Sequence, residues 1–447
     1  MVAGSGGLES GPVTILSGEE KGVCILKKGG GRMAGGGLQP RWGQPLTGIV
    51  SLCCFFVVAM VTWFVFSDPR GPIGWFPYPF VMYLAMMILV GLWQHMFLGD
   101  WPFQNIRQPL RGVIMTIANL VIVWFVIDVL FYRVLGTGFN FLSYYGMEAA
   151  NAAGKLPKVA AAGASGQLAR VAVVCFVLIG FYSYPVFTIF FGKWPVMPSD
   201  LKQPAKGLAE IGWASLVTLF FYAVLIVPFF GSVYPGAVLN PSWWAALGGT
   251  GHVHWVFGWW EWAIIILFMT PNVWRMKPWT LIDLPQPWKG LACMLLSFVG
   301  AYAVALLCRQ LTPLWVPAET FHHLEAAKGA AEVQRFLWLH AAEIAGFTLI
   351  PFLIWHHYFD DMAPGANPDN WGGFLFRTIG VGVFAAISYA IFYFGNFGHW
   401  GLGNHHMTDL AERFIHGESL VWNFWWIIPL LWNEWFFHKW PFYVEKH

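Results

Sequence analysis

About ten long apolar stretches follow one another along this chain, and they limit its possible folds more than any other feature. A helix needs about 20 mostly apolar residues to cross the hydrocarbon core of a bilayer. Only 11% of the 447 residues are charged, whereas soluble globular proteins carry about 25%. The sequence therefore predicts an all-α fold, a polytopic membrane bundle of about ten transmembrane helices. The predicted spans cover residues 47–67, 78–99, 112–136, 169–192, 208–231, 255–274, 289–308, 336–357, 373–395 and 417–438.

Charge and cysteine content argue against several other classes of protein. The formal net charge is only +2 and no long basic run occurs, so nucleic-acid binding is disfavoured. Six cysteines are present, without a Cys-x-x-Cys pair. Neither a disulfide framework nor an iron–sulfur pattern is therefore expected. The 28 Trp residues fit interfacial belts and packing at crowded helix crossings.

A repeated connector separates several of the predicted spans. In residues 101–112, 194–207 and 278–290, a Pro beside a Trp is followed by Gln-Pro-x-Lys/Arg-Gly. Residues 367–372 carry a degenerate copy, and residues 440–441 repeat the Trp-Pro pair after the last span. The first Pro ends one helix and the second begins the next. The repetition predicts a series of helical hairpins made by internal duplication, with chance similarity of interface chemistry as the alternative.

The distribution of basic residues predicts the orientation and the domain boundaries. Sixteen of the 25 Lys and Arg residues lie in the N-terminal tail and on the connector side, and this excess predicts that side to be cytoplasmic. We expect a flexible cytoplasmic tail over 1–46, a single transmembrane domain over 47–438 and a short cytoplasmic tail over 439–447. Both termini are then inside, and a bacterial inner membrane is the expected location.

Histidines are concentrated in loops on the side opposite the connectors, the predicted outer face. Imidazole and carboxylate groups together suit copper, iron, manganese or zinc. We expect a short amphipathic helix near 407–416, because polar residues there recur every three to four positions. The alternative is an ordinary solvated face with scattered histidines. The candidate metal ligands are His252, His254, His322, His323, His399, His405, His406, Asp409 and His416.

Two carboxylates inside predicted spans are candidate catalytic residues, because ionisable groups are costly at membrane depth. Glu343 stands among small residues and shares a helix face with His340, and Glu261 follows an aromatic run. We expect these carboxylates to carry protons or to add ligands below the outer loops.

Haem is the alternative cofactor, and it needs one His on each of two facing helices at similar depth. His95 and His356, near the inner ends of their spans, form one candidate pair. His340 with a histidine of an outer loop forms another. For His95, a hydrogen-bonded interfacial position beside Trp93 is the competing interpretation.

These features favour an integral membrane oxidoreductase, or the membrane subunit of a respiratory or other redox complex. Its cofactor is a transition metal, with copper or iron expected first, or a haem near the outer face. Quinone in the bilayer or an outer-face redox subunit is the expected electron partner. Two alternatives stay open: a secondary transporter that uses buried Glu and kinked helices, and a non-catalytic scaffold subunit of a larger membrane assembly.

Overall fold

The computed structural model describes residues 38–74, 80–135, 158–197, 199–226, 255–360, 370–417 and 419–445. These residues are mostly helical, with one small two-stranded sheet. The elements are β1 (Leu38–Pro40), α1 (Leu46–Phe66), α2 (Phe80–Leu92), η1 (Trp93–Phe97), α3 (Leu110–Trp124), η2 (Phe125–Leu135), α6 (Lys158–Ile189), α7 (Ala205–Phe221), η3 (Tyr222–Ile226), α10 (Trp255–Asn272), η4 (Trp279–Leu281), α11 (Trp288–Leu311), η5 (Thr312–Leu314), α12 (Ala318–Lys328), α13 (Ala330–Gly346), α14 (Leu349–Tyr358), α15 (Trp371–Tyr393), α16 (Phe397–Trp400), α17 (Leu410–Ile415), α18 (Ser419–Trp435) and β2 (Tyr443–Glu445).

Five helices within the described residues are long and apolar enough to cross a membrane. They indicate that a lipid bilayer is the environment of the chain. Helical residues occur in every predicted span, and the number of membrane crossings stays a prediction. The five long helices are Leu46–Phe66, Leu110–Phe131, Trp288–Leu314, Ala330–Tyr358 and Trp371–Tyr393.

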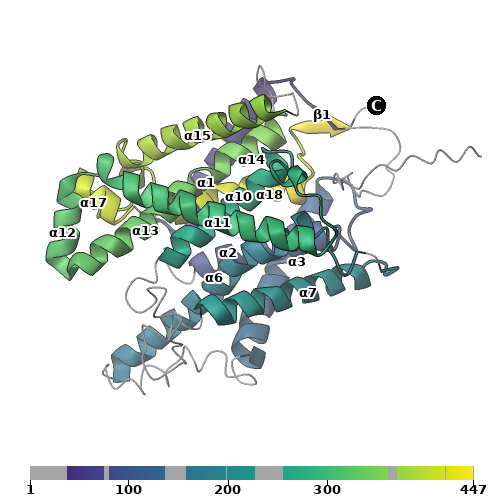
Figure 1. The fold of residues 1–447 in the computed structure, drawn as a ribbon, viewed down its shortest axis with the longest axis horizontal. Coiled ribbons are helices and arrows are strands. Elements are labelled where there is room, and N and C mark those ends of the chain that lie inside the picture. Colours follow the sequence, from purple (N-terminus) through teal and green to yellow (C-terminus); the bar gives the residue numbers. More distant parts are fainter. Residues whose placement is uncertain are drawn as a thin grey trace, which may run out of the picture. The chain divides into compact units, whose positions relative to one another are not determined.

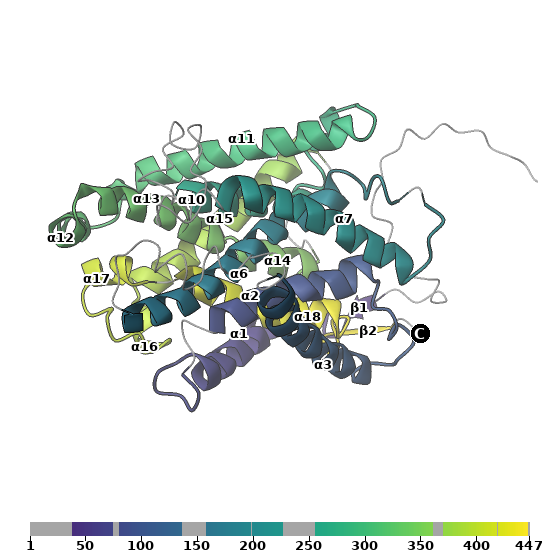
Figure 2. The ribbon, with the colours of Figure 1, turned by 90° about the horizontal axis from the view of Figure 1, so that it is seen from below.

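An inner set of helices forms a closed cycle of contacts. Helix α2 packs on α6, α6 on α10, and α10 on both α13 and α14; these two pack on α18, which returns to α2. These helices carry most of the buried apolar side chains. Figures 1 and 2 show α2, α6 and α18 lying among the other helices. The inner helices therefore form the core.

Five further helices of the described chain, α1, α3, α7, α11 and α15, lie against this inner set. Each buries only a narrow stripe. In α11 the buried residues are Gly290, Cys293, Ser297, Ala301 and Ala305, three or four positions apart. The other faces of these outer helices expose large apolar side chains, as expected of helices that face lipid.

The bundle has a connector side and a histidine side. The connector side holds the Gln-Pro segments that precede α1, α3, α7 and α11. The histidine side holds α12, α16 and α17. Both views place α12 and α17 at one end and β1 at the other (Figures 1 and 2).

The Gln-Pro segments make one repeated set of contacts. Gln108 Nε2 donates to the carbonyl of Phe436 after α18 (2.8 Å), while Gln108 Oε1 accepts from the amide of Gly112 (3.3 Å). Each glutamine thereby satisfies one unpaired carbonyl and one unpaired amide at two helix ends. Equivalent pairs of bonds are made by Gln44, Gln203 and Gln286.

Tryptophan side chains join neighbouring helices through their indole N–H groups. Trp262 Nε1 donates to the carbonyl of Ala341 (3.0 Å), which joins α10 to α13. Trp63 Nε1 donates to the carbonyl of Leu402 (3.1 Å). Because no water is present in a bilayer core, a buried indole N–H needs a partner from the protein. Similar bonds are made by Trp259, Trp260 and Trp425.

Several elements differ from the sequence prediction. The span predicted over 336–357 is divided into α13 and α14. The amphipathic helix expected near 407–416 is shorter, because Asp409 is the N-cap of α17 and its side chain accepts from the Glu412 amide. Strands β1 and β2 pair antiparallel, within the two segments assigned above to terminal tails. The fold is therefore helical with a small sheet rather than purely all-α.

Candidate functional site

A pocket of about 300 Å³ opens on the histidine side of the described chain. Three predicted metal ligands, His405, His406 and His416, lie in its wall. The rest of the wall comes from the end of α1 and the turn after it, from α16 and the loop that follows it, and from Gly417 after α17. Residues far apart in sequence are thus brought to one concave surface.

Asn404 holds the loop that carries these imidazoles. Its Nδ2 donates to the carbonyl of His416 (2.8 Å), and its Oδ1 accepts from the amide of His406 (3.0 Å). The ring centroids of His406 and His416 lie 5.5 Å apart. Two imidazoles bound to one tetrahedral ion have centroids about 5 Å apart, given bonds of about 2.0 Å. The spacing of this pair suits a shared ion.

A buried acid lies behind the turn that contributes to the pocket. Asp68 is 1% exposed and accepts from the guanidinium (2.6 Å) and the amide (2.8 Å) of Arg70. Burial raises the pKa of Asp68, but the bonds from Arg70 and the charge of nearby His405 hold the pKa below its usual value. Within the described residues, buried Ser67 Oγ has no hydrogen-bond partner, and Ser67 lines the pocket. The wall therefore includes a serine whose buried hydroxyl is unpartnered among the described atoms.

Glu412 of α17 lies between two histidines. Its Oε1 is 3.5 Å from His323 Nδ1 on α12, and its Oε2 is 3.2 Å from His416 Nε2. The sequence places Glu412 on the polar face of the predicted helix, yet not among the predicted ligands. The carboxylate connects α12 to the pocket.

Three other predicted ligands have separate surroundings. Asp409 uses its side chain to cap α17, as described above. His399 Nδ1 donates to the carbonyl of Asn404 (3.1 Å), and its ring centroid lies 6.2 Å from that of His405. His322 is exposed on α12. Of these three residues, His399 lies next to the pocket, because its ring is near that of His405, which lines the pocket.

A hydrogen-bonded network lies in the interior around His340, which is fully buried. His340 Nδ1 is 2.7 Å from Glu343 Oε2, and His340 Nε2 is 2.7 Å from the Tyr389 hydroxyl. Glu343 Oε2 also accepts from the Tyr393 hydroxyl (2.7 Å). The shared helix face predicted for His340 and Glu343 is present. Tyr389 and Tyr393 were not among the predicted site residues.

The donors and acceptors present give the hydrogen bonds of this network a consistent direction. Trp315 Nε1 donates to the Tyr389 hydroxyl (2.9 Å), so the Tyr389 proton is available to His340 Nε2. His340 Nδ1 then carries a proton toward the Glu343 carboxylate. In this direction both ring nitrogens of His340 have a partner. The network connects a buried imidazole to two phenols and a carboxylate that is 18% exposed.

The network lies directly beneath the pocket. A Cβ added at Gly417, a lining residue, would lie 3.0 Å from the Tyr393 hydroxyl. The ring of Phe414 stacks on Tyr393 (4.6 Å) and meets His340 edge-on (5.7 Å). Gly417 thus lines the pocket and also lies close to the Tyr393 hydroxyl.

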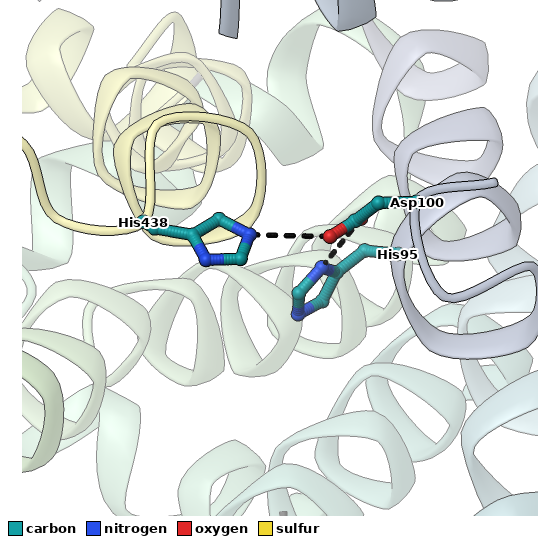
Figure 3. Close-up of side chains that lie close together, drawn as sticks. All are labelled: His95, Asp100 and His438. Atoms are coloured by element: carbon teal, nitrogen blue, oxygen red, sulfur yellow. Dashed lines mark hydrogen bonds and ion pairs between the residues drawn. The ribbon is translucent and has the colours of Figure 1, made fainter. Parts of the chain in front are cut away.

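A second histidine group lies on the connector side. His95 Nδ1 is 3.0 Å from Asp100 Oδ1, and His438 Nε2 is 3.1 Å from Asp100 Oδ2 (Figure 3). The guanidinium of Arg111 also bonds to Asp100 Oδ2. Burial raises the pKa of Asp100, but bonds from both imidazoles and the charge of Arg111 hold this pKa well below its usual value.

The other predicted residues are placed as follows. His95 bonds to Asp100 and stacks on Trp435 (centroids 6.2 Å apart), which agrees with the hydrogen-bonded interpretation rather than with a haem pair. The ring of His356 lies 4.9 Å from that of His357. Glu261 is buried in α10, and its Oε1 has no hydrogen-bond partner within the described residues. Two predicted ligands, His252 and His254, lie outside the described residues.

The predicted ligands of the histidine side that the structure describes are therefore not gathered around one point. Among the described residues, His95, Asp100 and His438 are the group of three whose ligating atoms all lie within 4.8 Å of one another. Sequence reasoning missed Asp100 and His438. The available signal was position, since both occur in the turn just before a Trp-Pro pair.

No protein-family model, curated protein or solved structure matches the chain.

Proposed function

We propose that this chain is an integral membrane oxidoreductase, or the membrane subunit of a redox complex, with a transition metal or haem at the histidine side. One observation carries the proposal: a pocket walled by His405, His406 and His416 lies over the hydrogen-bonded network of His340 and Glu343. Imidazole ligands suit copper and iron, and proton-coupled redox chemistry uses a positioned proton donor or acceptor. In this chain the imidazoles of the pocket lie next to the hydrogen-bonded network of His340 and Glu343.

The residues have distinct roles in this proposal. His406 and His416, with the closest pair of rings in the pocket, hold the metal, for which copper or iron is expected first. His405 and Ser67 line the same cavity, and His405 orients what binds there. Tyr393 and Glu343 pass protons between the pocket and His340.

The architecture proposed here is a bundle of about ten spans built from helical hairpins. The four equivalent Gln-Pro contacts and the closed cycle of inner helices support this arrangement. We place the histidine side outside and the connector side in the cytoplasm of a bacterial inner membrane, because basic residues are more frequent on the connector side. Quinone or an outer-face redox subunit supplies or removes electrons.

Metal analysis and an optical spectrum of the purified chain in detergent test the proposal. We expect roughly one equivalent of copper, iron or haem per chain, reduced by more than about tenfold in the double variant His406→Gln and His416→Gln. His322→Gln is the matched control, because this exposed imidazole of α12 does not line the pocket. A colourless, metal-free preparation would overturn the proposal, as would equal loss in the control.

A secondary transporter is the second candidate, and Glu261 is the observation that favours it. Its buried Oε1, unpartnered among described atoms, is typical of a site that takes up a proton or a cation during transport. Ion-driven uptake into proteoliposomes that is lost in Glu261→Gln, with Glu325→Gln on exposed α12 unchanged, would support transport. Absence of uptake under a proton or sodium gradient would reject it.

A further inference from the structure

We propose that His95, Asp100 and His438 form a divalent transition-metal site on the connector side, separate from the proposed centre on the histidine side. His95 belongs to η1, Asp100 lies in the turn after η1, and His438 lies in the turn after α18. Two imidazoles and one carboxylate are a donor set suited to zinc, iron(II) or manganese(II).

The distances between the ligating atoms fit an ion. Around a tetrahedral ion with bonds of about 2.0 Å, neighbouring ligand atoms lie about 3.3 Å apart. His95 Nδ1 and His438 Nε2 lie 3.0 and 3.1 Å from the carboxylate oxygens of Asp100. One ligating atom from each of the three residues lies within 4.8 Å of the other two, so bringing them to about 3.3 Å of one another would convert the hydrogen-bonded triad into a coordination shell. Each ligating nitrogen must be free of its proton when the ion binds, and a neutral imidazole then carries that proton on its other ring nitrogen.

The backbone holds the ligands in place before any ion binds. Asp100 and His438 both have left-handed backbone conformations, with φ of 62° and 49°. The amide of Asp100 donates to the carbonyl of Gln94 (2.9 Å), which turns its carboxylate back toward His95. Lys193 has the same left-handed backbone conformation in an equivalent turn. The backbone strain is therefore a property of the repeated turn. The side chains of His95, Asp100 and His438 distinguish the turn at Asp100 from the turn at Lys193.

A comparison with that equivalent turn shows what is particular here. Lys193 sends its ammonium to Glu210 (2.7 Å) and to the carbonyl of Met96 (3.1 Å), forming an ordinary ion pair. At Asp100 the charge is reversed, and the carboxylate meets two imidazoles as well as Arg111. Arg111 alone is enough to form a structural ion pair with Asp100. The two imidazoles are not needed for that pair.

Access and charge are compatible with binding. The side chains of His95 and His438 are each 33% exposed, whereas Asp100 is 6% exposed. An ion can therefore approach from the connector side and keep a position open to water or a small ligand. Arg111 bonds to Asp100 Oδ2, which leaves Oδ1 for the ion. The nearby guanidinium weakens cation binding, so the site favours an ion that forms strong bonds to imidazole.

Cobalt(II) and zinc(II) are the probes for this site, added to the chelator-treated full chain in nanodiscs. Cobalt(II) should give visible ligand-field bands, with about one equivalent bound to the double variant His406→Gln and His416→Gln, in which the proposed histidine-side centre is removed. His95→Gln and His438→Gln should each weaken binding by more than about 100-fold, since even partners outside the coordination shell are worth 10–100-fold. Zinc(II) should raise the melting temperature of the native chain and leave that of both variants unchanged.

Two controls separate this site from other histidines. His357→Gln removes a neighbouring imidazole that pairs with Glu434 (3.3 Å) and should leave the cobalt spectrum intact. The double variant His406→Gln and His416→Gln should also keep it, even if the proposed redox centre is abolished. Unchanged cobalt titrations in both folded variants, His95→Gln and His438→Gln, would overturn the inference. Loss of the cobalt spectrum in the His406→Gln and His416→Gln double variant alone would also overturn the inference.

Discussion

At the scale of single residues, the polar groups of this chain are kept in the apolar interior by specific partners. His340, fully buried, has a partner for each ring nitrogen. Asp68, equally inaccessible, has a bidentate guanidinium from Arg70. Leaving such groups unpaired would cost about 1–3 kcal/mol each. Several buried polar atoms depart from this rule among the described atoms, and Glu261 Oε1 and Ser67 Oγ, which belong to proposed sites, are two of them.

The pairing of Asp68 with Arg70 predicts a pH dependence of stability. The folded-state pKa of Asp68 lies below its unfolded value of about 3.9. The pair therefore contributes its full stabilisation above about pH 4 and loses it as the pH falls through the folded-state pKa. We expect Asp68→Asn to lower the melting temperature at pH 7 and to reduce its further decline between pH 5 and pH 3.

Melting curves of the purified protein from pH 7 to pH 3 measure this effect. Asp283→Asn is the control, because Asp283 is exposed on the connector side. If Asp68→Asn and the native chain declined in parallel on acidification, the Asp68–Arg70 pair would not be the source of the pH dependence.

At the scale of elements, glycines where outer helices begin allow close packing against the ends of inner helices. A Cβ at Gly112 or Gly290 would overlap the ring of Phe437 or Phe191. At Gly207, near the start of α7, a Cβ would lie 2.7 Å from the carbonyl oxygen of Phe97. The glycine of the Gln-Pro segment is therefore required by sterics and not only by turn geometry.

Two glycines of α7 make a matched pair of tests. We expect Gly207→Ala to lower the free energy of unfolding by about 1–3 kcal/mol, because backbone must move to accept the methyl group. Gly212→Ala has nothing within 4 Å of its new Cβ, so it should be neutral or stabilising by up to about 1 kcal/mol. Denaturant unfolding of both variants in the same detergent gives the comparison. Equal effects would contradict the steric argument.

At the scale of the whole molecule, the inner helices close on one another and separate two polar ends. The histidine side gathers the pocket and the network of His340, while the connector side gathers the triad of His95, Asp100 and His438. The proposed orientation places these two groups in different aqueous compartments.

Cysteine labelling in intact cells tests that orientation. In a chain with its native cysteines replaced, Glu325→Cys on α12 should react with a membrane-impermeant maleimide from outside. Asn105→Cys on the connector side should react only after the membrane is permeabilised. Both positions are exposed, so differences in burial do not explain the contrast. Labelling of Asn105→Cys in intact cells, with Glu325→Cys protected, would invert the proposed topology.

The apolar stretches and Gln-Pro segments were enough to predict a membrane-embedded helical chain and the approximate bounds of its helices. The reason is physical: period, length and proline position act within a few residues of one another. The common face of His340 and Glu343 was predictable for the same reason, since both lie on one helix.

Tertiary structure alone decided which histidines meet. His95 and His438 are separated by most of the chain, yet both reach Asp100, because the cycle of inner helices brings α18 back to α2. Similarly, Tyr389 and Tyr393 reach His340 from another helix. Spacing along a sequence carries no information about such closure, which depends on how whole helices pack.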